Sequence, residues 1–142
     1  MSAAANKKLV QQVYTDAASR SGTTFIDNIA DDVRWVVTGQ YSWSRTYEGR
    51  DAVLNGLQGH FRSLLAERPR TVAFNFIAEG DFVVVEAKGD NVTKTGVRYD
   101  NEYCMIWRLQ NGRIREIKEY CDSALVERAL GPFPADKLAK AG

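Results

Sequence analysis

Side chains suited to proton chemistry alternate with apolar ones in the segment GVRYDNEYCMIWRLQNGRIREIKEYCD (residues 96–122). Tyr99, Asn101 and Tyr103 recur at every second position, so they share one face of a strand. Glu119 lies among apolar residues in the second half of the segment. Carboxyl and phenol groups on one surface could exchange protons with a bound molecule and hold its oxygen atoms. We therefore predict that this segment forms the wall of a pocket.

The segment is predicted to fold as two antiparallel strands joined at residues 110–112 (Gln-Asn-Gly). A two-residue Asn-Gly turn would set Tyr103 opposite Tyr120, whereas a three-residue loop would set Tyr103 opposite Glu119. A slip of one residue exchanges the two faces of a strand. The spacing alone therefore leaves both registers open.

A tight turn at residues 93–96 would place Glu86 opposite Tyr103, with Lys88 and Asp90 beside them. When carboxylates lie close together, the pKa of one of them is raised. That carboxyl group can then act as a general acid or base near neutral pH. The predicted catalytic set is Glu119, Glu86, Lys88 and Asp90.

Several aromatic residues could line the same pocket, although each also has a structural interpretation. Tyr14 lies on an apolar helix face and could be a core residue whose hydroxyl finds a partner. Trp43 lies in a predicted loop and could cover a pocket mouth. His60 is the only imidazole, and it could transfer protons or simply lie at a helix surface. The predicted ligand-binding set is Tyr14, Trp35, Trp43, His60, Tyr99, Asn101 and Tyr103.

Composition favours one soluble globular domain. The chain has 142 residues, 44% of them hydrophobic, and a formal net charge of +1. This balance predicts neither nucleic acid nor a membrane surface as a partner. The amino-terminal residues lack the apolar core of a secretory signal, so a cytoplasmic location is predicted. We expect a single domain over residues 1–142, with its core at about 7–131 and a tail at 132–142.

Two cysteines and one histidine are few ligands for a metal site. No metal and no cofactor are therefore predicted, and Cys104 and Cys121 are expected to be free thiols.

Periodicity predicts helices over residues 6–20, 24–31 and 52–68, with Asn6 as the first N-cap. Strand patterns cover residues 32–38, 71–78, 82–92, 97–109 and 113–122. Residues 39–50 are predicted as a loop, and residues 126–130 as a closing helical turn. This order predicts an α+β fold with the helices on one face of the sheet.

The segments YEGRDAV (residues 47–53) and YDNEYCMIWRLQNGRIREIKEYCD (residues 99–122) resemble the SnoaL-like branch of the nuclear-transport-factor-2-like superfamily. The resemblance extends over residues 7–131. It implies an α+β roll of the cystatin-like kind, in which a cone-shaped, curved mixed sheet wraps around three helices. It also implies a deep pocket and a dimer interface on the outer face of the sheet. Relatives include polyketide cyclases, ketosteroid isomerases, limonene-epoxide hydrolases and dehydratases.

By this resemblance, Glu119 falls where polyketide cyclases and epoxide hydrolases place a catalytic Asp, which favours the three-residue register. Lys88 and Asp90 are similar to the Arg and Asp that complete the set of the epoxide hydrolases. The Tyr and Asn that hold water in those hydrolases would fall near Trp35 and Val37, which cannot do so. The resemblance therefore argues against epoxide hydrolysis.

Tyr14 matches the Tyr that donates to the oxyanion in ketosteroid isomerases, but the general-base Asp of that family would fall at Val37. Steroid isomerisation by that route is not expected. What the resemblance implies is proton transfer of an isomerase, cyclase or dehydratase kind on a small, largely apolar molecule. The alternatives are a non-catalytic binder or a dimeric accessory protein. The expected partners are a small hydrophobic molecule and a second copy of the chain, bound through the outer sheet face.

Overall fold

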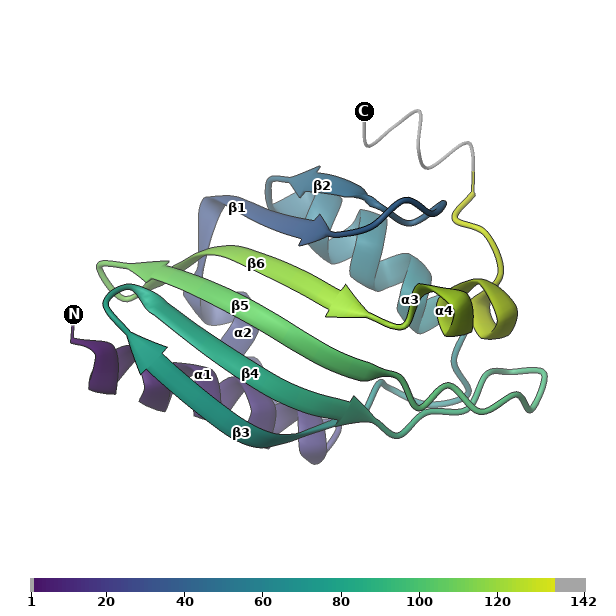
Figure 1. Cartoon of the computed structure of the whole chain (residues 1–142), viewed down its shortest axis with the longest axis horizontal. Coiled ribbons are helices and arrows are strands. Elements are labelled where there is room, and N and C mark those ends of the chain that lie inside the picture. Colours follow the sequence, from purple (N-terminus) through teal and green to yellow (C-terminus); the bar gives the residue numbers. More distant parts are fainter. Residues whose placement is uncertain (1, 135–142) are drawn as a thin grey trace.

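A computed structural model of the chain describes residues 2–134 (Figure 1). Most of the predicted tail at 132–142 therefore lies outside the described residues. The strands are β1 (Ile29–Val37), β2 (Arg45–Glu48), β3 (Thr71–Glu79), β4 (Phe82–Gly89), β5 (Glu102–Gln110) and β6 (Arg113–Cys121). The helices are α1 (Ala3–Ala18), α2 (Thr24–Asn28), the π-helix η1 (Ala52–Gln58), α3 (Gly59–Ser63) and α4 (Ser123–Leu130).

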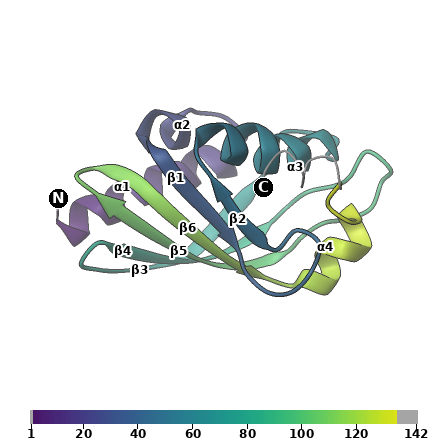
Figure 2. The same cartoon turned by 90° about the horizontal axis from the view of Figure 1, so that it is seen from above.

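The six strands form one sheet in the order β2-β1-β6-β5-β4-β3. Strand β1 runs parallel to β6, and the other neighbouring pairs are antiparallel. Figure 2 shows the sheet curving beneath α1, α2 and α3, with α4 at one end. The predicted α+β fold with a curved, mixed sheet around helices is confirmed.

Several predicted elements differ in their bounds from the structure; for example, α2 ends at Asn28 rather than at 31, and β5 begins at Glu102 rather than at 97. Helix α1 starts earlier because Ser2, not Asn6, is its N-cap: the Ser2 hydroxyl accepts a hydrogen bond from the Ala5 amide at 3.1 Å. The predicted loop at 39–50 contains the short strand β2. The third predicted helix stops at Ser63, because the chain turns there and Leu65 forms a bridge with Thr93.

Neither predicted register of the β5–β6 hairpin is correct. The turn is the two-residue Asn111–Gly112, both with positive φ (52° and 74°), as a twisted hairpin turn requires. A bulge then leaves Arg115 without a partner in β5, and this shifts the pairing so that Tyr103 lies opposite Cys121. The actual partner of Tyr103, Cys121, is two residues from the partner predicted for the three-residue loop, Glu119. Because side chains alternate between the two faces of a strand, Tyr103 and Glu119 still share a face.

The predicted pairing of β4 with β5 is wrong by one residue. Tyr103 lies opposite Ala87, and Glu86 lies opposite Cys104. The slip arises in the link between these strands, where Val92 forms a bridge with Arg98 and not with Val97 as predicted. One residue is enough to turn Glu86 and its alternate neighbours to the outer face.

The core fills the concave side of the sheet, between the strands and the helices. Its fully buried members are Val10, Val33, Tyr47, Val53, Val83, Val85, Leu109, Ile114 and Ile117. Each such apolar side chain contributes about 1.5–3 kcal/mol relative to an exposed position. Cys104 and Cys121 are free thiols, as predicted. Within residues 2–134, every helix is too short or too polar to cross a membrane.

Candidate functional site

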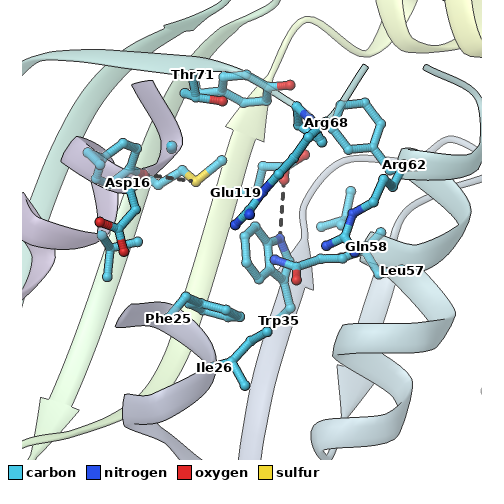
Figure 3. A pocket seen from close by; sticks show the side chains of 18 of the residues that line it. Asp16, Phe25, Ile26, Trp35, Leu57, Gln58, Arg62, Arg68, Thr71 and Glu119 are labelled. Atoms are coloured by element: carbon cyan, nitrogen blue, oxygen red, sulfur yellow. Dashed lines mark hydrogen bonds between the residues drawn. The ribbon is translucent and has the colours of Figure 1, made fainter. Parts of the chain in front are cut away.

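A cavity of about 230 Å³ opens between the concave face of the sheet and the helices. Its lining is mainly aromatic and aliphatic, and includes Phe25, Trp35, Leu57, Phe61, Met105 and Trp107. Figure 3 shows Glu119 and Trp35 within this lining, with residues of α2 and of the η1–α3 helix around them. Such a lining favours a ligand with an apolar body.

Glu119 brings a carboxyl group into the cavity. Its Oε1 accepts a hydrogen bond from Trp35 Nε1 at 3.2 Å, and its Oε2 accepts one from Cys121 Sγ at 3.6 Å (Figure 3 shows the first). Burial raises the pKa of Glu119 to about 7, and the two donors limit that rise. Near neutral pH this group is therefore populated in both its acid and its base form.

A chain of hydrogen-bonded side chains contacts this carboxyl group. The hydroxyl of Tyr41 lies 3.5 Å from Cys121 Sγ, which in turn donates to Glu119. Burial raises the pKa of Cys121 to about 12, so this thiol stays protonated and serves as a donor. Sequence reasoning missed both Cys121 and Tyr41 as site residues. The alternation of Cys121 with Glu119 in one strand was the pattern that could have identified Cys121.

The tyrosines predicted from the first strand meet at one point. Tyr99 Oη accepts hydrogen bonds from Tyr103 Oη at 3.2 Å and from Asn101 Nδ2 at 2.9 Å. Tyr99 and Tyr103 line the cavity, whereas Asn101 lies behind them and also binds the backbone of Asp122. Burial raises the pKa of both phenols, so both stay protonated.

Tyr14 lines the cavity, but its hydroxyl is fully used within the core. It donates to Met105 Sδ at 3.3 Å and accepts from Trp107 Nε1 at 3.1 Å. Burial raises its pKa. This environment fits the structural interpretation of Tyr14 better than a role as the oxyanion donor.

Trp43 and His60 lie side by side near one end of the cavity. Trp43 lines it and donates from Nε1 to the Gly131 carbonyl at 2.9 Å. The His60 ring packs against both Trp43 and Phe133, with centroid distances of 5.3 and 5.2 Å. His60 itself is not a lining residue of the cavity. It therefore supports Trp43 rather than facing a ligand.

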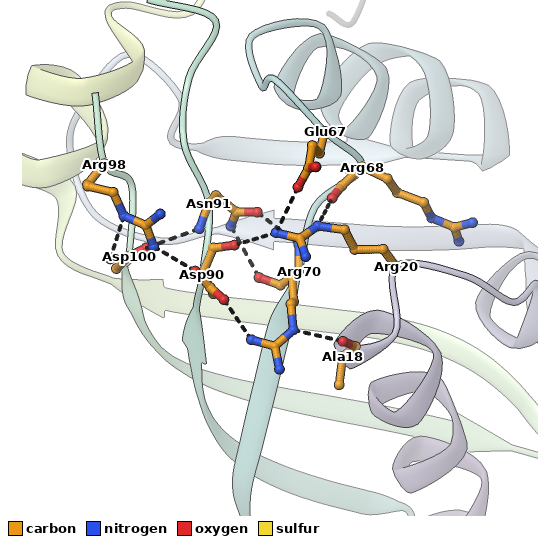
Figure 4. Close-up of polar contacts among 9 residues, drawn as sticks. All are labelled: Ala18, Arg20, Glu67, Arg68, Arg70, Asp90, Asn91, Arg98 and Asp100. Atoms are coloured by element: carbon orange, nitrogen blue, oxygen red, sulfur yellow. Dashed lines mark hydrogen bonds and ion pairs between the residues drawn. The ribbon is translucent and has the colours of Figure 1, made fainter. Parts of the chain in front are cut away.

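Three members of the predicted catalytic set lie outside the cavity. Glu86 and Lys88 are exposed on the outer face of the sheet, because of the one-residue slip described above. Asp90 ion-pairs with Arg98 at 2.6 Å and Arg70 at 2.7 Å (Figure 4). These arginines lower the pKa of Asp90. The prediction that Glu86, Lys88 and Asp90 share a site with Glu119 was therefore wrong. Asp90 belongs instead to a network of ion pairs outside the cavity.

That network links α1 to the neighbouring strands. Arg70 Nε donates to the Ala18 carbonyl at 2.8 Å, and Arg20 donates to the Asp90 carbonyl at 3.1 Å (Figure 4). Within residues 2–134, no cluster of three or more His, Cys, Asp or Glu side chains could hold a metal ion.

The stability of the protein should depend on pH through Glu119. Its pKa is about 7 in the folded protein against an ordinary 4.5, so the folded state binds this proton more tightly. The resulting stabilisation is complete below the ordinary pKa and is lost as the pH rises through about 7. Relative to Glu119→Gln, the free energy of unfolding of the wild type should fall by on the order of 2–3 kcal/mol between about pH 4 and pH 8. Urea unfolding measures this difference.

The matched control for that experiment is Glu86→Gln, a change on the exposed outer face. This variant retains Glu119, so it should keep the wild-type dependence on pH. A difference between the wild type and Glu119→Gln that stays constant over this range would contradict the raised pKa.

Comparison with known proteins relates most of the chain to one family. The family model of the SnoaL-like domain matches residues 10–117. A nuclear-transport-factor-2-like protein of unknown function from Burkholderia pseudomallei is 26% identical, covers 91% of this chain and 98% of its own, and superposes with a TM-score of 0.75. No curated protein sequence matches the chain.

Two further structures share the fold at lower identity. A candidate SnoaL-like polyketide cyclase from Jannaschia sp. CCS1 is 18% identical, covers 92% of this chain and 94% of its own, and has a TM-score of 0.72. A protein with a ketosteroid isomerase-like fold from Catenulispora acidiphila, in complex with trimethylamine, is 20% identical, covers 91% and 95%, and has a TM-score of 0.68.

Proposed function

The chain belongs to the SnoaL-like domain family, and from this we propose that its cavity binds a small, largely apolar carbonyl compound on which Glu119 transfers a proton. The observation that carries the proposal is the carboxyl group of Glu119, which lies in a mainly aromatic cavity and has a pKa of about 7. A general acid or base is most effective when its pKa lies near the working pH. Glu119 would remove a proton next to the carbonyl group and return it to another position.

A carbonyl oxygen that gains negative charge needs a hydrogen-bond donor, and Tyr99 is best placed to supply it. Its hydroxyl accepts two hydrogen bonds, so its own hydrogen can be donated to a ligand. The hydrogens of Tyr14 and Tyr103 are already donated to Met105 and to Tyr99. A neutral phenol supported by two donors stabilises a developing oxyanion without reorganisation.

The proposal can be tested without the natural substrate. 2-Tetralone is a compact apolar ketone with acidic hydrogens beside its carbonyl group. In deuterium oxide the protein should accelerate exchange of these hydrogens, which proton NMR measures as a loss of signal. Exchange no faster than in buffer, at concentrations where tryptophan fluorescence shows 2-tetralone bound, would refute the catalytic proposal.

A non-catalytic binder is the second candidate, and one observation favours it. Of the four predicted catalytic side chains, only Glu119 lies in the cavity. Enzyme sites more often gather several ionisable groups, whereas a mainly apolar lining suits simple binding. Binding of 2-tetralone without exchange is the result that this candidate predicts.

The outer face of the sheet is the proposed homodimer interface. Phe74, Ile77 and Phe82 are exposed there, with 67%, 57% and 46% of their surface accessible. Ile77 continues through Val84 into Ile106 as an apolar row across three strands. Exposed apolar patches of this kind mark association sites, and a two-fold axis would cover the patch with its own copy.

Replacing Ile77 with glutamate should therefore convert the protein from dimer to monomer in sedimentation equilibrium, because the charge could not be buried at the interface. Val97→Glu is the matched control, because Val97 is exposed on a loop away from this row. A wild-type protein that sediments as a monomer would contradict the interface.

A cytoplasmic location stays a prediction from the sequence.

A further inference from the structure

Two arginines and a glutamine border the cavity on its solvent side. Arg62 and Gln58 come from the η1–α3 helix, where a spacing of four residues places them on one face. Arg68 comes from the segment that follows this helix. Figure 3 shows the side chains of Arg62 and Arg68 extending from their backbones toward the other labelled lining residues. Sequence reasoning assigned none of the three to the site.

The guanidinium groups at this mouth are poorly neutralised. Among residues 2–134, the Arg62 side chain forms neither a hydrogen bond nor an ion pair, and Arg68 donates only to the Gly22 carbonyl, at 2.8 Å. Asp16 also lines the cavity and interacts electrostatically with Arg68. Its carboxylate, however, is bound to the Thr24 amide and to Gln12, both at 3.0 Å. The mouth therefore keeps an excess of positive charge beside an apolar interior.

From this arrangement we propose that the ligand is an apolar ring compound bearing a carboxylate, whose ring enters the cavity and whose carboxylate lies between Arg62 and Arg68. The inference rests on the proposed function and narrows the class of its ligand. Guanidinium groups match a carboxylate with paired hydrogen bonds, and the Gln58 amide adds a neutral donor. The ring is held by the aromatic lining.

The same geometry sets the orientation of the ligand. Arg62 and Arg68 are exposed, whereas Trp35 and Tyr103 are buried. A carboxylate held at the mouth stays apart from the carboxyl group of Glu119, which in its ionised form would repel it. The end of the ligand that enters the cavity is therefore the uncharged one, and any carbonyl group that reacts lies at that end.

A matched pair of probes tests the charge requirement. 2-Naphthoate and 2-naphthamide have the same ring system and differ in the charge of one group. Isothermal titration of the intact protein should show that the wild type binds the carboxylate about 3- to 20-fold more tightly than the amide, as two solvent-exposed charge pairs allow. Arg62→Gln should reduce this preference, and the double variant with Arg68→Gln should abolish it.

Arg128→Gln is the control, because Arg128 is exposed on α4 and does not line the cavity. It should keep the full preference for the carboxylate. The single Arg62→Gln variant breaks no hydrogen bond or ion pair within the described chain, so its result does not depend on whether the double variant folds. High salt should narrow the preference in the wild type.

Three outcomes separate this inference from the proposed function. A preference that disappears with the arginines supports the inference. Equal binding of both probes to the wild type overturns the inference and leaves the proposed apolar cavity in place. Failure of both probes to bind overturns the proposed cavity ligand as well.

Discussion

Replacing Glu119 with glutamine is expected to slow proton exchange in bound 2-tetralone by about 10²- to 10⁴-fold. Glutamine has the same size and can still accept the hydrogen bond from Trp35 Nε1, but it cannot take up a proton at neutral pH. Proton NMR in deuterium oxide measures the loss. Glu86→Gln should keep the wild-type rate, because Glu86 lies on the outer face. Equal rates for the wild type and Glu119→Gln would remove Glu119 from the mechanism.

The dependence of that rate on pH follows from the same group. Glu119 acts as a base only when ionised, and its pKa is about 7. The exchange rate should therefore rise with pH through about 7 and level off above it. A rate that levels off near the ordinary 4.5 of a glutamate would mean that the cavity does not tune this side chain.

Trp107→Ala, a truncation in the cavity wall, is expected to lower the free energy of unfolding by about 3–5 kcal/mol. The indole is 2% exposed and makes edge-on contacts with Tyr14, Phe25 and Trp35 at centroid distances of 5.7, 5.9 and 6.3 Å. Its Nε1 also donates to the Tyr14 hydroxyl. Urea unfolding followed by circular dichroism measures the change.

Trp107→Phe separates the contributions of the ring and of the hydrogen bond. It retains an aromatic ring but removes the donor to Tyr14, so a loss of about 1–2 kcal/mol is expected. A loss in Trp107→Ala no larger than this would show that the aromatic cluster does not hold the cavity wall together.

The fold could be predicted from the sequence because its elements follow simple periodicities. Alternation in strands and three-to-four spacing in helices identified the element order, and the resemblance supplied the curvature of the sheet. Strand β2 was missed because four residues, Arg45–Glu48, are too few for a pattern to be recognised. The early start of α1 was missed because its first residues, Ala3 to Ala5, are small and add no large apolar side chain to the helical pattern.

The site was less predictable, since it depends on pairing rather than on pattern. Two local features decide which side chains face the cavity. One is the bulge at Arg115, which has no partner in β5, and the other is the one-residue slip near Val92. Tyr103 and Glu119 were correctly placed on one face, because the actual register of β5 and β6 differs from the predicted three-residue register by two residues. Glu86 was placed on the wrong face because the actual register of β4 and β5 differs from the predicted one by one residue. Nothing in a single sequence reports such shifts.

The titration of Glu119 tests the central claim most directly. Carbon-13 labelling of the glutamate carboxyl groups, with the Glu119 signal assigned by its absence from Glu119→Gln, allows its protonation to be followed by NMR. A midpoint of about 7 is the result expected for the carboxyl group of Glu119 in the cavity. A midpoint at or below the ordinary 4.5 would contradict it, because such a carboxylate would be too weak a base for the proposed proton transfer.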